Sequence, residues 1–401
     1  MSIWILAVLL MAVVAGMGCR QGAIRAAFSF VGLLLGALLA RPFAHLIEPL
    51  LPMVGLKNPV YIRLLPPCIA FLAVLGVLKV IGLVVHKKVE FRYKYWAEQL
   101  RLPLWERLNH RLGLSLGLLN GAAYFILASL GIYLLSYWTF QLATPGADPR
   151  TIRIVNRLGK DLETTDMVQV ACAIDSAPTA YYGLADVVGL IYHNPLLQAR
   201  LSSYPAFLGL AERPEIQDIA NDMHFAELQM RQAPILELVN YPKMQAILKN
   251  PELLEAILGA LVPNSSDLTN YLATGKSPKF DPEQILGRWN FDAAASVALL
   301  RKTKPNINSS DMQKWKKWMG ANYATASAIA TPAHKVFLKG FPQTKPSAEK
   351  HTMQGQWKSA GDKYTFTLNA EGGVQDLTAE VQNGRLLLPG PGIELVFSRE
   401  Y

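Results

Sequence analysis

The stretch Gly18-Cys19-Arg20-Gln21-Gly22-Ala23-Ile24-Arg25 decides the fold of this chain, because it interrupts an almost uniformly apolar N-terminus. Residues 1–17 before it and 26–40 after it contain no charged side chain. An apolar segment of about 20 residues is long enough to cross a bilayer as a helix. The sequence therefore predicts two membrane-spanning helices that meet at a polar corner bearing two arginines.

Two further apolar stretches complete a set of four predicted spans. Only 17% of the residues are charged, whereas a soluble domain usually carries about 25%. The deficit lies in the first 143 residues, and residues 146–401 have the composition of an ordinary soluble protein. The predicted spans are residues 2–18, 23–40, 64–85 and 112–142.

The basic residues favour one orientation in the membrane. Seven Lys and Arg lie between the third and fourth spans, against three between the second and third. Because basic loops stay in the cytoplasm, we expect both termini outside it, in the periplasm of a bacterial envelope. Residues 89–112 are predicted to lie as an amphipathic segment on the membrane surface. Lys79 is expected to extend its side chain to the lipid headgroups.

Glycines recur at four-residue spacing within the spans. Small residues at this spacing let two helix backbones approach closely in lipid. The pattern predicts either a tightly packed bundle or a homo-oligomer joined through these faces. The glycines are Gly18 and Gly22, Gly32 and Gly36, and the triplet Gly113, Gly117 and Gly121.

The corner resembles the first signature of the CvpA (colicin V production protein) family. That signature has a glycine, an Arg-x-Gly step and a second arginine that opens the next helix. The corresponding residues here are Gly18, Arg20, Gly22 and Arg25.

The start of the fourth span resembles the family's second signature, Asp-Arg-x-x-Gly-x-x-x-Gly-x-x-Arg-Gly. Arg111 and the glycine triplet match it, but His110 and Asn120 replace the usual Asp and Arg. The resemblance covers residues 1–143. It implies an inner-membrane protein surrounded by membrane lipids, without an established catalytic activity, linked to colicin V production, toxin export or cell-envelope homeostasis.

Residues 146–280 are predicted to form an extracytoplasmic helical module. Proline is well tolerated at the first position of a helix, so a proline about every ten residues predicts a run of very short helices. Asn194 and Asn250 are predicted N-caps, and residues 264–279 are predicted to be a linker. The pattern resembles the Asn-Pro modules of Hop-type co-chaperones, so the module either binds an envelope protein or peptide or is a compact domain without a ligand. The prolines are Pro195, Pro205, Pro214, Pro234, Pro242 and Pro251.

Residues 281–401 are predicted to form a small antiparallel α+β domain. Period-two alternation predicts strands at 334–341, 364–369, 375–382, 385–388 and 394–398, with helices at 293–303 and 311–330. The segment resembles lipocalin-like envelope domains, which open with Gly-x-Trp and end in an arginine-capped strand. This resemblance implies a half-barrel that binds an apolar ligand, and a closed, filled sheet is the alternative. The candidate ligand-binding residues are Trp289, Trp357 and Arg399.

The fold class is thus four transmembrane helices, a soluble helical module and a half-barrel. No acid, base and nucleophile converge, and no histidines pair at metal-ligand spacing, so we expect no enzyme, metal or cofactor. The net charge of +9 comes without a groove-reading motif, so we expect no nucleic-acid partner. Two other functions stay open: a transport component lined by Arg20, Arg25 and Lys79, and an apolar-ligand carrier acting through the C-terminal domain.

Overall fold

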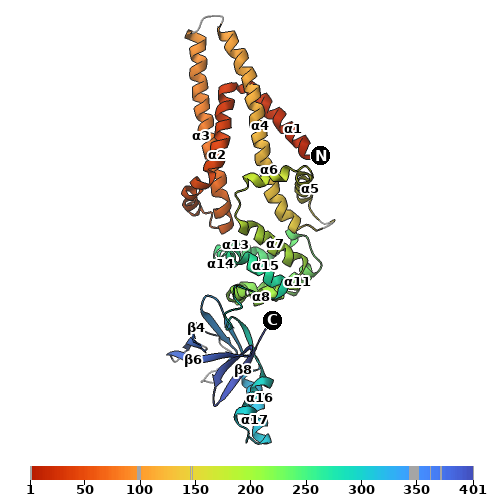
Figure 1. Cartoon of the computed structure of the whole chain (residues 1–401), viewed down its shortest axis with the longest axis vertical. Helices are drawn as coiled ribbons and strands as arrows, with labels where there is room; N and C mark the ends of the chain where they lie inside the picture. Colours follow the sequence, from red (N-terminus) through yellow and green to blue (C-terminus); the bar gives the residue numbers. More distant parts are fainter. Residues whose placement is uncertain are drawn as a thin grey trace. The chain divides into compact units, whose positions relative to one another are not determined.

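The computed structural model describes residues 2–96, 101–144, 146, 148–342, 352–361, 363–370 and 373–400. By its internal contacts the chain divides into two compact units, Met1–Ala185 with Ala233–Glu255, and Asp186–Gln232 with Ala256–Tyr401. The first unit begins with four long helices (Figure 1), and they are the helices of the described chain that are long and apolar enough to cross a membrane. The four predicted spans are confirmed. They are α1 (Ser2–Gln21), α2 (Ala23–Ile47), α3 (Pro59–Trp96) and α4 (Arg101–Gln141).

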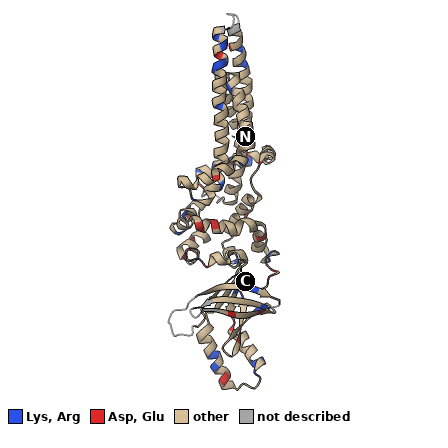
Figure 2. Cartoon of the chain, turned by 90° about the vertical axis from the view of Figure 1, so that its left-hand side faces the viewer, with Lys and Arg blue, Asp and Glu red and all other residues tan. Residues whose placement is uncertain are grey.

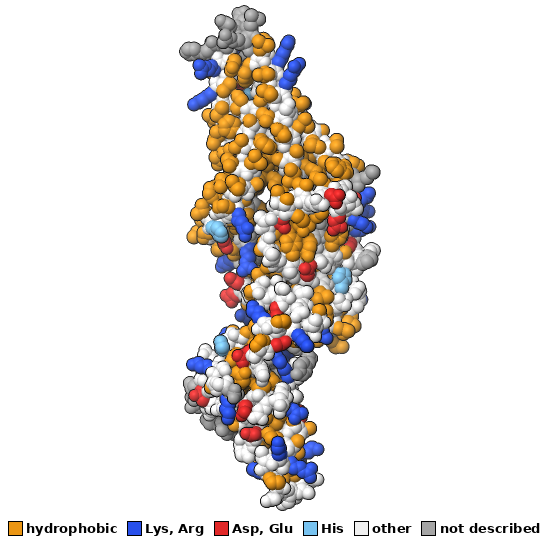
Figure 3. Space-filling model, viewed as in Figure 1, with side chains coloured by type: hydrophobic (Ala, Val, Ile, Leu, Met, Phe, Trp, Pro, Cys, Tyr) orange, Lys and Arg blue, Asp and Glu red, His pale blue; other side chains and the backbone are white. Residues whose placement is uncertain are grey.

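The four helices form two pairs rather than a symmetric bundle. α2 packs along α3, α1 packs along α4, and α2 also contacts α4, whereas α3 and α4 barely touch. The short turns η1 (Glu48–Leu50) and η2 (Pro52–Val54) lead from α2 to α3. Large apolar side chains such as Leu38 (72% exposed) cover the outer faces, and Figure 3 shows them as a continuous orange surface. Such a surface suits hydrocarbon rather than water.

The predicted surface segment at 89–112 is wrong. α3 continues without a break to Trp96, and α4 already begins at Arg101. At about 1.5 Å per residue both helices exceed the roughly 30 Å hydrocarbon core, so their charged ends project beyond it. No glycine or proline lies between Leu83 and Trp96 to stop α3, and the ring of Phe91 contacts that of Tyr95 one turn later, with the centroids 4.6 Å apart. In Figure 2 the blue ribbon segments at these ends mark Lys and Arg residues.

Shorter helices complete the first unit: α5 packs on α1 and α4, and α6 packs on α4. Leu162 of α5 is buried against Ile3, Ala7 and Phe125, which confirms the helix predicted at 151–163. The main-chain N–H of Ser2 donates to Asp161 at 2.7 Å, and hydrogen bonds from Ser2 lower the pKa of Asp161 to about 2. The carboxylate therefore stays charged at the N-terminus of α1, where negative charge is favourable. These elements are α5 (Arg150–Thr164), α6 (Met167–Ile174), α12 (Ile235–Val239) and α13 (Pro242–Lys249); α7 (Thr179–His193) and α14 (Pro251–Leu261) run from one unit into the other.

The predicted run of short, proline-started helices is confirmed. Pro205, Pro214, Pro242 and Pro251 are first residues of helices, and Pro234 precedes α12 directly. In the second unit these helices are α8 (Leu197–Ser203), η3 (Pro205–Phe207), α9 (Leu208–Ala211), α10 (Pro214–Ala220) and α11 (Met223–Met230), followed by η4 (Val262–Asn264) and α15 (Ser265–Thr274).

Two local predictions here are wrong and one is confirmed. Asn250 caps α14 by accepting the N–H of Leu253 at 3.2 Å. Asn194 instead donates to the carbonyl of Leu190, because α8 begins only at Leu197. The predicted linker at 264–279 contains helix α15, since Leu268 and Leu272, one turn apart, are fully buried. The many polar residues of this segment led to the linker prediction, although Leu268 and Leu272 form one buried face of a helix.

The C-terminal strands close into an antiparallel eight-stranded barrel in chain order, with β1 pairing to β8. The predicted half-barrel is therefore a complete barrel. The predicted strands and the helix at 293–303 are confirmed, but the helix predicted at 311–330 ends at Tyr323, and residues 327–330 form a strand between β1 and β3. The strands are β1 (Gly287–Phe291), β2 (Ser327–Ala330), β3 (Lys335–Lys339), β4 (Met353–Ala360), β5 (Lys363–Ala370), β6 (Gly373–Gln382), β7 (Arg385–Gly390) and β8 (Ile393–Arg399); α16 (Ala293–Thr303) and α17 (Ser309–Tyr323) lie between β1 and β2.

Large side chains fill the barrel interior. Phe366, Leu386 and Phe397 are completely buried, and Phe366 and Leu386 alternate with more exposed neighbours along their strands. This alternation is the period of two expected of a strand with one face in the core. The structure thus has the closed, filled form of the domain.

Tyr364 provides a pH-dependent test of the barrel. Its hydroxyl donates to Glu283 at 2.7 Å, and burial, with that hydrogen bond, raises the pKa of Tyr364 from 10 to about 12. Because the folded-state pKa is raised, this contribution to stability is complete below pH 10 and is lost as the pH rises toward 12. In ultraviolet titrations, the difference between wild type and Tyr364→Phe should show one tyrosine ionising near pH 12. A midpoint near 10 in the folded protein would contradict the assignment.

Candidate functional site

The polar corner lies where α1 gives way to α2 within a single residue. Gly22 has a φ of +85°, and its N–H donates to the carbonyl of Gly18 at 2.9 Å. Only glycine adopts this backbone conformation without strain. A Cβ on Gly22 would also lie 2.3 Å from Nδ2 of Asn109. The corner therefore requires glycine for both its conformation and its contact with α4.

α4 supplies polar partners to both helix ends at the corner. Oδ1 of Asn109 accepts the N–H of Ala23 at 2.8 Å, the role of an N-cap for α2. Nδ1 of His110 lies 2.7 Å from the carbonyl of Cys19 at the end of α1, so this nitrogen carries the proton. Free N–H and C=O groups at helix ends are costly in a membrane unless they are paired. We call Asn109, His110 and Asn120 the corner clamp.

Asn120 is the most deeply buried member of the clamp. Its residue is 3% exposed, and Nδ2 donates to the carbonyl of Ala26 at 2.8 Å. His110 and Asn120 are the two positions that depart from the family signature. Here His110 contacts the backbone of α1, and Asn120 contacts the backbone of α2. Sequence reasoning did not single out Asn109; its position directly before His110 and Arg111 was the available signal.

The glycine triplet forms the contact between α4 and α1. A Cβ on Gly113 would lie 2.4 Å from the carbonyl oxygen of Gly18, and one on Gly117 would lie 2.8 Å from Cα of Ala15. A Cβ on Gly121 would lie 2.8 Å from Cα of Met11. The backbones thus touch directly, as small residues at four-residue spacing predict.

The glycine pair Gly32 and Gly36 forms part of the contact between α2 and α3. Gly32 faces Leu75 and Leu78, and Gly36 faces Phe71, so both lie against α3. The described glycines of both motifs thus contact helices of the same chain. Homo-oligomerisation through these faces stays a prediction.

The basic residues of the corner and Lys79 differ in their exposure. Arg20, Arg111 and Lys79 are exposed, whereas Arg25 is half-buried. Among the described residues, Nε of Arg25 is buried without a hydrogen-bond partner, as are Nδ1 of His86 and Oδ1 of Asn120. Lys79 lies on an outer face, as its extension to the headgroups requires. A transport route along Arg20, Arg25 and Lys79 stays a prediction.

The candidate ligand residues of the barrel are held within the chain. Trp289 is 1% exposed, and its Nε1 donates to the carbonyl of Ile285 at 2.8 Å. Arg399 lies over the Trp289 ring at 5.9 Å and donates to the carbonyl of Leu286 at 2.7 Å. Nε1 of Trp357 donates to the carbonyl of Thr331 at 2.9 Å. These contacts fasten the barrel, and ligand binding by the three residues stays a prediction.

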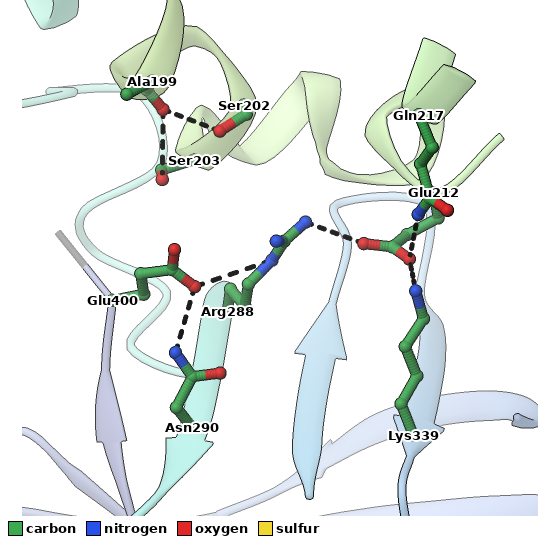
Figure 4. Close-up of polar contacts among 9 residues, drawn as sticks. All are labelled: Ala199, Ser202, Ser203, Glu212, Gln217, Arg288, Asn290, Lys339 and Glu400. Atoms are coloured by element: carbon green, nitrogen blue, oxygen red, sulfur yellow. Dashed lines mark hydrogen bonds and ion pairs between the residues drawn. The ribbon is translucent and has the colours of Figure 1, made fainter. Parts of the chain in front are cut away.

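A buried carboxylate joins the short helices of the second unit to the barrel (Figure 4). The side chain of Glu212 is 6% exposed; it pairs with Arg288 of β1 at 2.7 Å and with Lys339 of β3. Gln217 also donates to it at 3.3 Å. With its oxygens engaged by two cations and an amide, Glu212 acts as a structural anchor rather than as a general base.

The four apolar helices and their glycine contacts define a multi-pass membrane protein. Comparison with known protein families shows that residues 2–144 match the family described as Colicin V production protein. The family match thus covers the four apolar helices, in agreement with the resemblance of the two signatures. Neither the curated proteins nor the solved structures contain a match to the chain.

Replacing Gly113 tests the glycine contact. Gly113→Ala should lower the free energy of unfolding by about 1–3 kcal/mol, because a methyl group must enter a backbone contact. Gly131→Ala on the same helix is the matched control: nothing lies within 4 Å of its Cβ position, so the change should be neutral or stabilise by up to about 1 kcal/mol. Unfolding in mixed micelles of increasing denaturing detergent would measure both. Equal effects at the two positions would contradict the proposed contact.

Proposed function

We propose that the chain is a non-enzymatic inner-membrane protein of the CvpA type. Its helical domain anchors a module outside the cytoplasm that binds another envelope protein or a peptide, in support of toxin export or cell-envelope homeostasis. The observation that carries this proposal is the accumulation of basic side chains at one end of the CvpA-type helices.

The basic end includes the corner. Lys87, Lys88, Arg92 and Lys94 are exposed on the projecting end of α3, which carries on past the level of the α1–α2 turn. Arg107 and Arg111 on α4 are exposed beside the corner clamp. Positive charge of this density favours the cytoplasmic side. We therefore assign the corner to the cytoplasmic face.

The opposite end of α4 has the character of a membrane–water interface. Trp138 and Tyr181 contact each other edge to face, and Tyr137 and Tyr182 do likewise. The hydroxyl of Tyr181 donates to the carbonyl of Leu134. Aromatic rings with polar edges gather at such interfaces. The chain leaves the membrane at this end, which supports an extracytoplasmic position for everything after Gln141.

Exposed apolar side chains on the short helices support a binding role for the module. Leu196 is 81% exposed, Met223 82% and Met230 66%. Exposed methionines adapt to differently shaped partners and are common on peptide- and protein-binding surfaces. The filled barrel gives less support to the function of an apolar-ligand carrier, because side chains such as Phe366 and Phe397 occupy the interior where a ligand would bind.

The native cysteines make the orientation testable. Cys172 is exposed on α6, beyond the spans. In intact cells from which the outer membrane has been removed, a membrane-impermeant maleimide should label Cys172. A cysteine introduced at the basic end by Lys88→Cys, in a chain carrying Cys172→Ser, should be labelled only after the inner membrane is opened. The reverse pattern would place the module in the cytoplasm and refute the proposed orientation.

Site-specific crosslinking tests the binding role. A photo-crosslinking amino acid at Met223 should trap a discrete protein or peptide adduct in living cells, and Met230→Glu in the same chain should reduce that adduct by roughly tenfold, or about 1.4 kcal/mol. The same amino acid at Gln313, an exposed position on α17, serves as the control. Identical adducts from Met223 and Gln313, or none from Met223, would count against a binding surface on these helices.

A further inference from the structure

An apolar groove runs along the membrane domain between α3 and α4, with α2 as its floor. It exists because α3 and α4 each pack on α2 and barely on each other. Its volume is about 670 Å³, far more than the roughly 30 Å³ share of one water molecule. Leu33 and Ala37 line it from α2, Phe71 from α3, and Leu127 from α4.

The lining of the groove matches hydrocarbon. Apart from Cys68 and Ser176, every residue that lines it is apolar. Cys68 is an exposed free thiol on α3. The groove lies within helices that are long and apolar enough to cross the bilayer, so lipid chains, and not water, surround it. An apolar groove in that setting accepts an apolar chain without desolvating any polar group.

One end of the groove coincides with the aromatic interface. Ile174 at the end of α6 and Ser176 just after it line the groove. Asp175 between them accepts the hydroxyl of Tyr182, whose ring contacts Tyr137 near the end of α4. On α4, Leu130 lines the groove, and one turn further on the carbonyl of Leu134 accepts the hydroxyl of Tyr181 at 2.9 Å. Rings with a polar edge favour the depth of the lipid headgroups. The groove thus has a polar end at headgroup depth and an apolar length running into the membrane.

We propose that this groove binds one hydrocarbon chain of a phospholipid, with the headgroup at the Ser176 end. Three alanines, Ala37, Ala40 and Ala123, keep the groove open, because longer side chains at those positions would occupy it. The bound chain fills the gap between α3 and α4 along the groove, where α2 holds both helices. The lipid is therefore a structural ligand of the CvpA-type domain.

Native mass spectrometry of the full-length protein in mild detergent tests the proposal. The delipidated chain, mixed with palmitoyl-oleoyl phosphatidylethanolamine, should retain one lipid. Ala123→Phe and Ala37→Phe should each weaken that retention by roughly tenfold. Leu38→Phe is the matched control: it adds a ring to the same helix, but at a side chain that is 72% exposed and does not line the groove, so retention should be unchanged.

The native cysteines provide a readout that needs no substitution. Bound lipid should slow the alkylation of Cys68 by N-ethylmaleimide and leave Cys172, which does not line the groove, at its original rate. Equal retention by all variants, or a Cys68 rate indifferent to lipid, would overturn the proposal. Binding of free palmitate as tight as that of the phospholipid would overturn the headgroup assignment. A dimer that Ala123→Phe dissociates would show that a second copy of the chain, and not a lipid, fills the groove.

Discussion

The membrane domain depends on one contact, the direct approach of the α1 and α4 backbones at Gly18 and Gly113. A Cβ on either glycine would lie 2.4 Å from the carbonyl oxygen of the other. In lipid no hydrophobic force drives helices together, so the packing of small residues has to do so. Gly117 and Gly121 extend this contact along α1.

The close approach of α1 and α4 also brings hydrogen-bond partners to the helix ends at the corner. Two helix ends meet at the corner, and their free backbone groups need partners. Because the backbones touch, Asn109 and His110 reach Ala23 and Cys19 directly. Asn120 does the same for the carbonyl of Ala26 one turn into α2. Residues that replace the charges of the family signature thus take over a neutral, structural role in this chain.

The second unit is held by a different kind of interaction. Because β1 pairs with β8 and the sheet closes, the barrel has no edge strand with unpaired backbone groups. Arg399 fixes that closure by covering Trp289 and bonding to the carbonyl of Leu286. Glu212 then fastens the neighbouring helices through two cations. A buried carboxylate with two basic partners favours one arrangement, since losing either partner leaves a charge uncompensated.

The sequence by itself determined the four spans, the corner, the glycine faces, the proline-started helices and most of the C-terminal strands. These follow from local patterns: apolar length, four-residue spacing, and the conformational limits of proline and glycine. Only the tertiary structure decided that Asn109, His110 and Asn120 clamp the corner, that residues 265–274 are helical, that residues 327–330 form a strand and that the barrel closes. Each of these depends on partners distant in the chain. Asn109 and Ala23 are 86 residues apart, and β1 and β8 are the first and last strands of the domain in the sequence. A local sequence pattern cannot predict such a pairing.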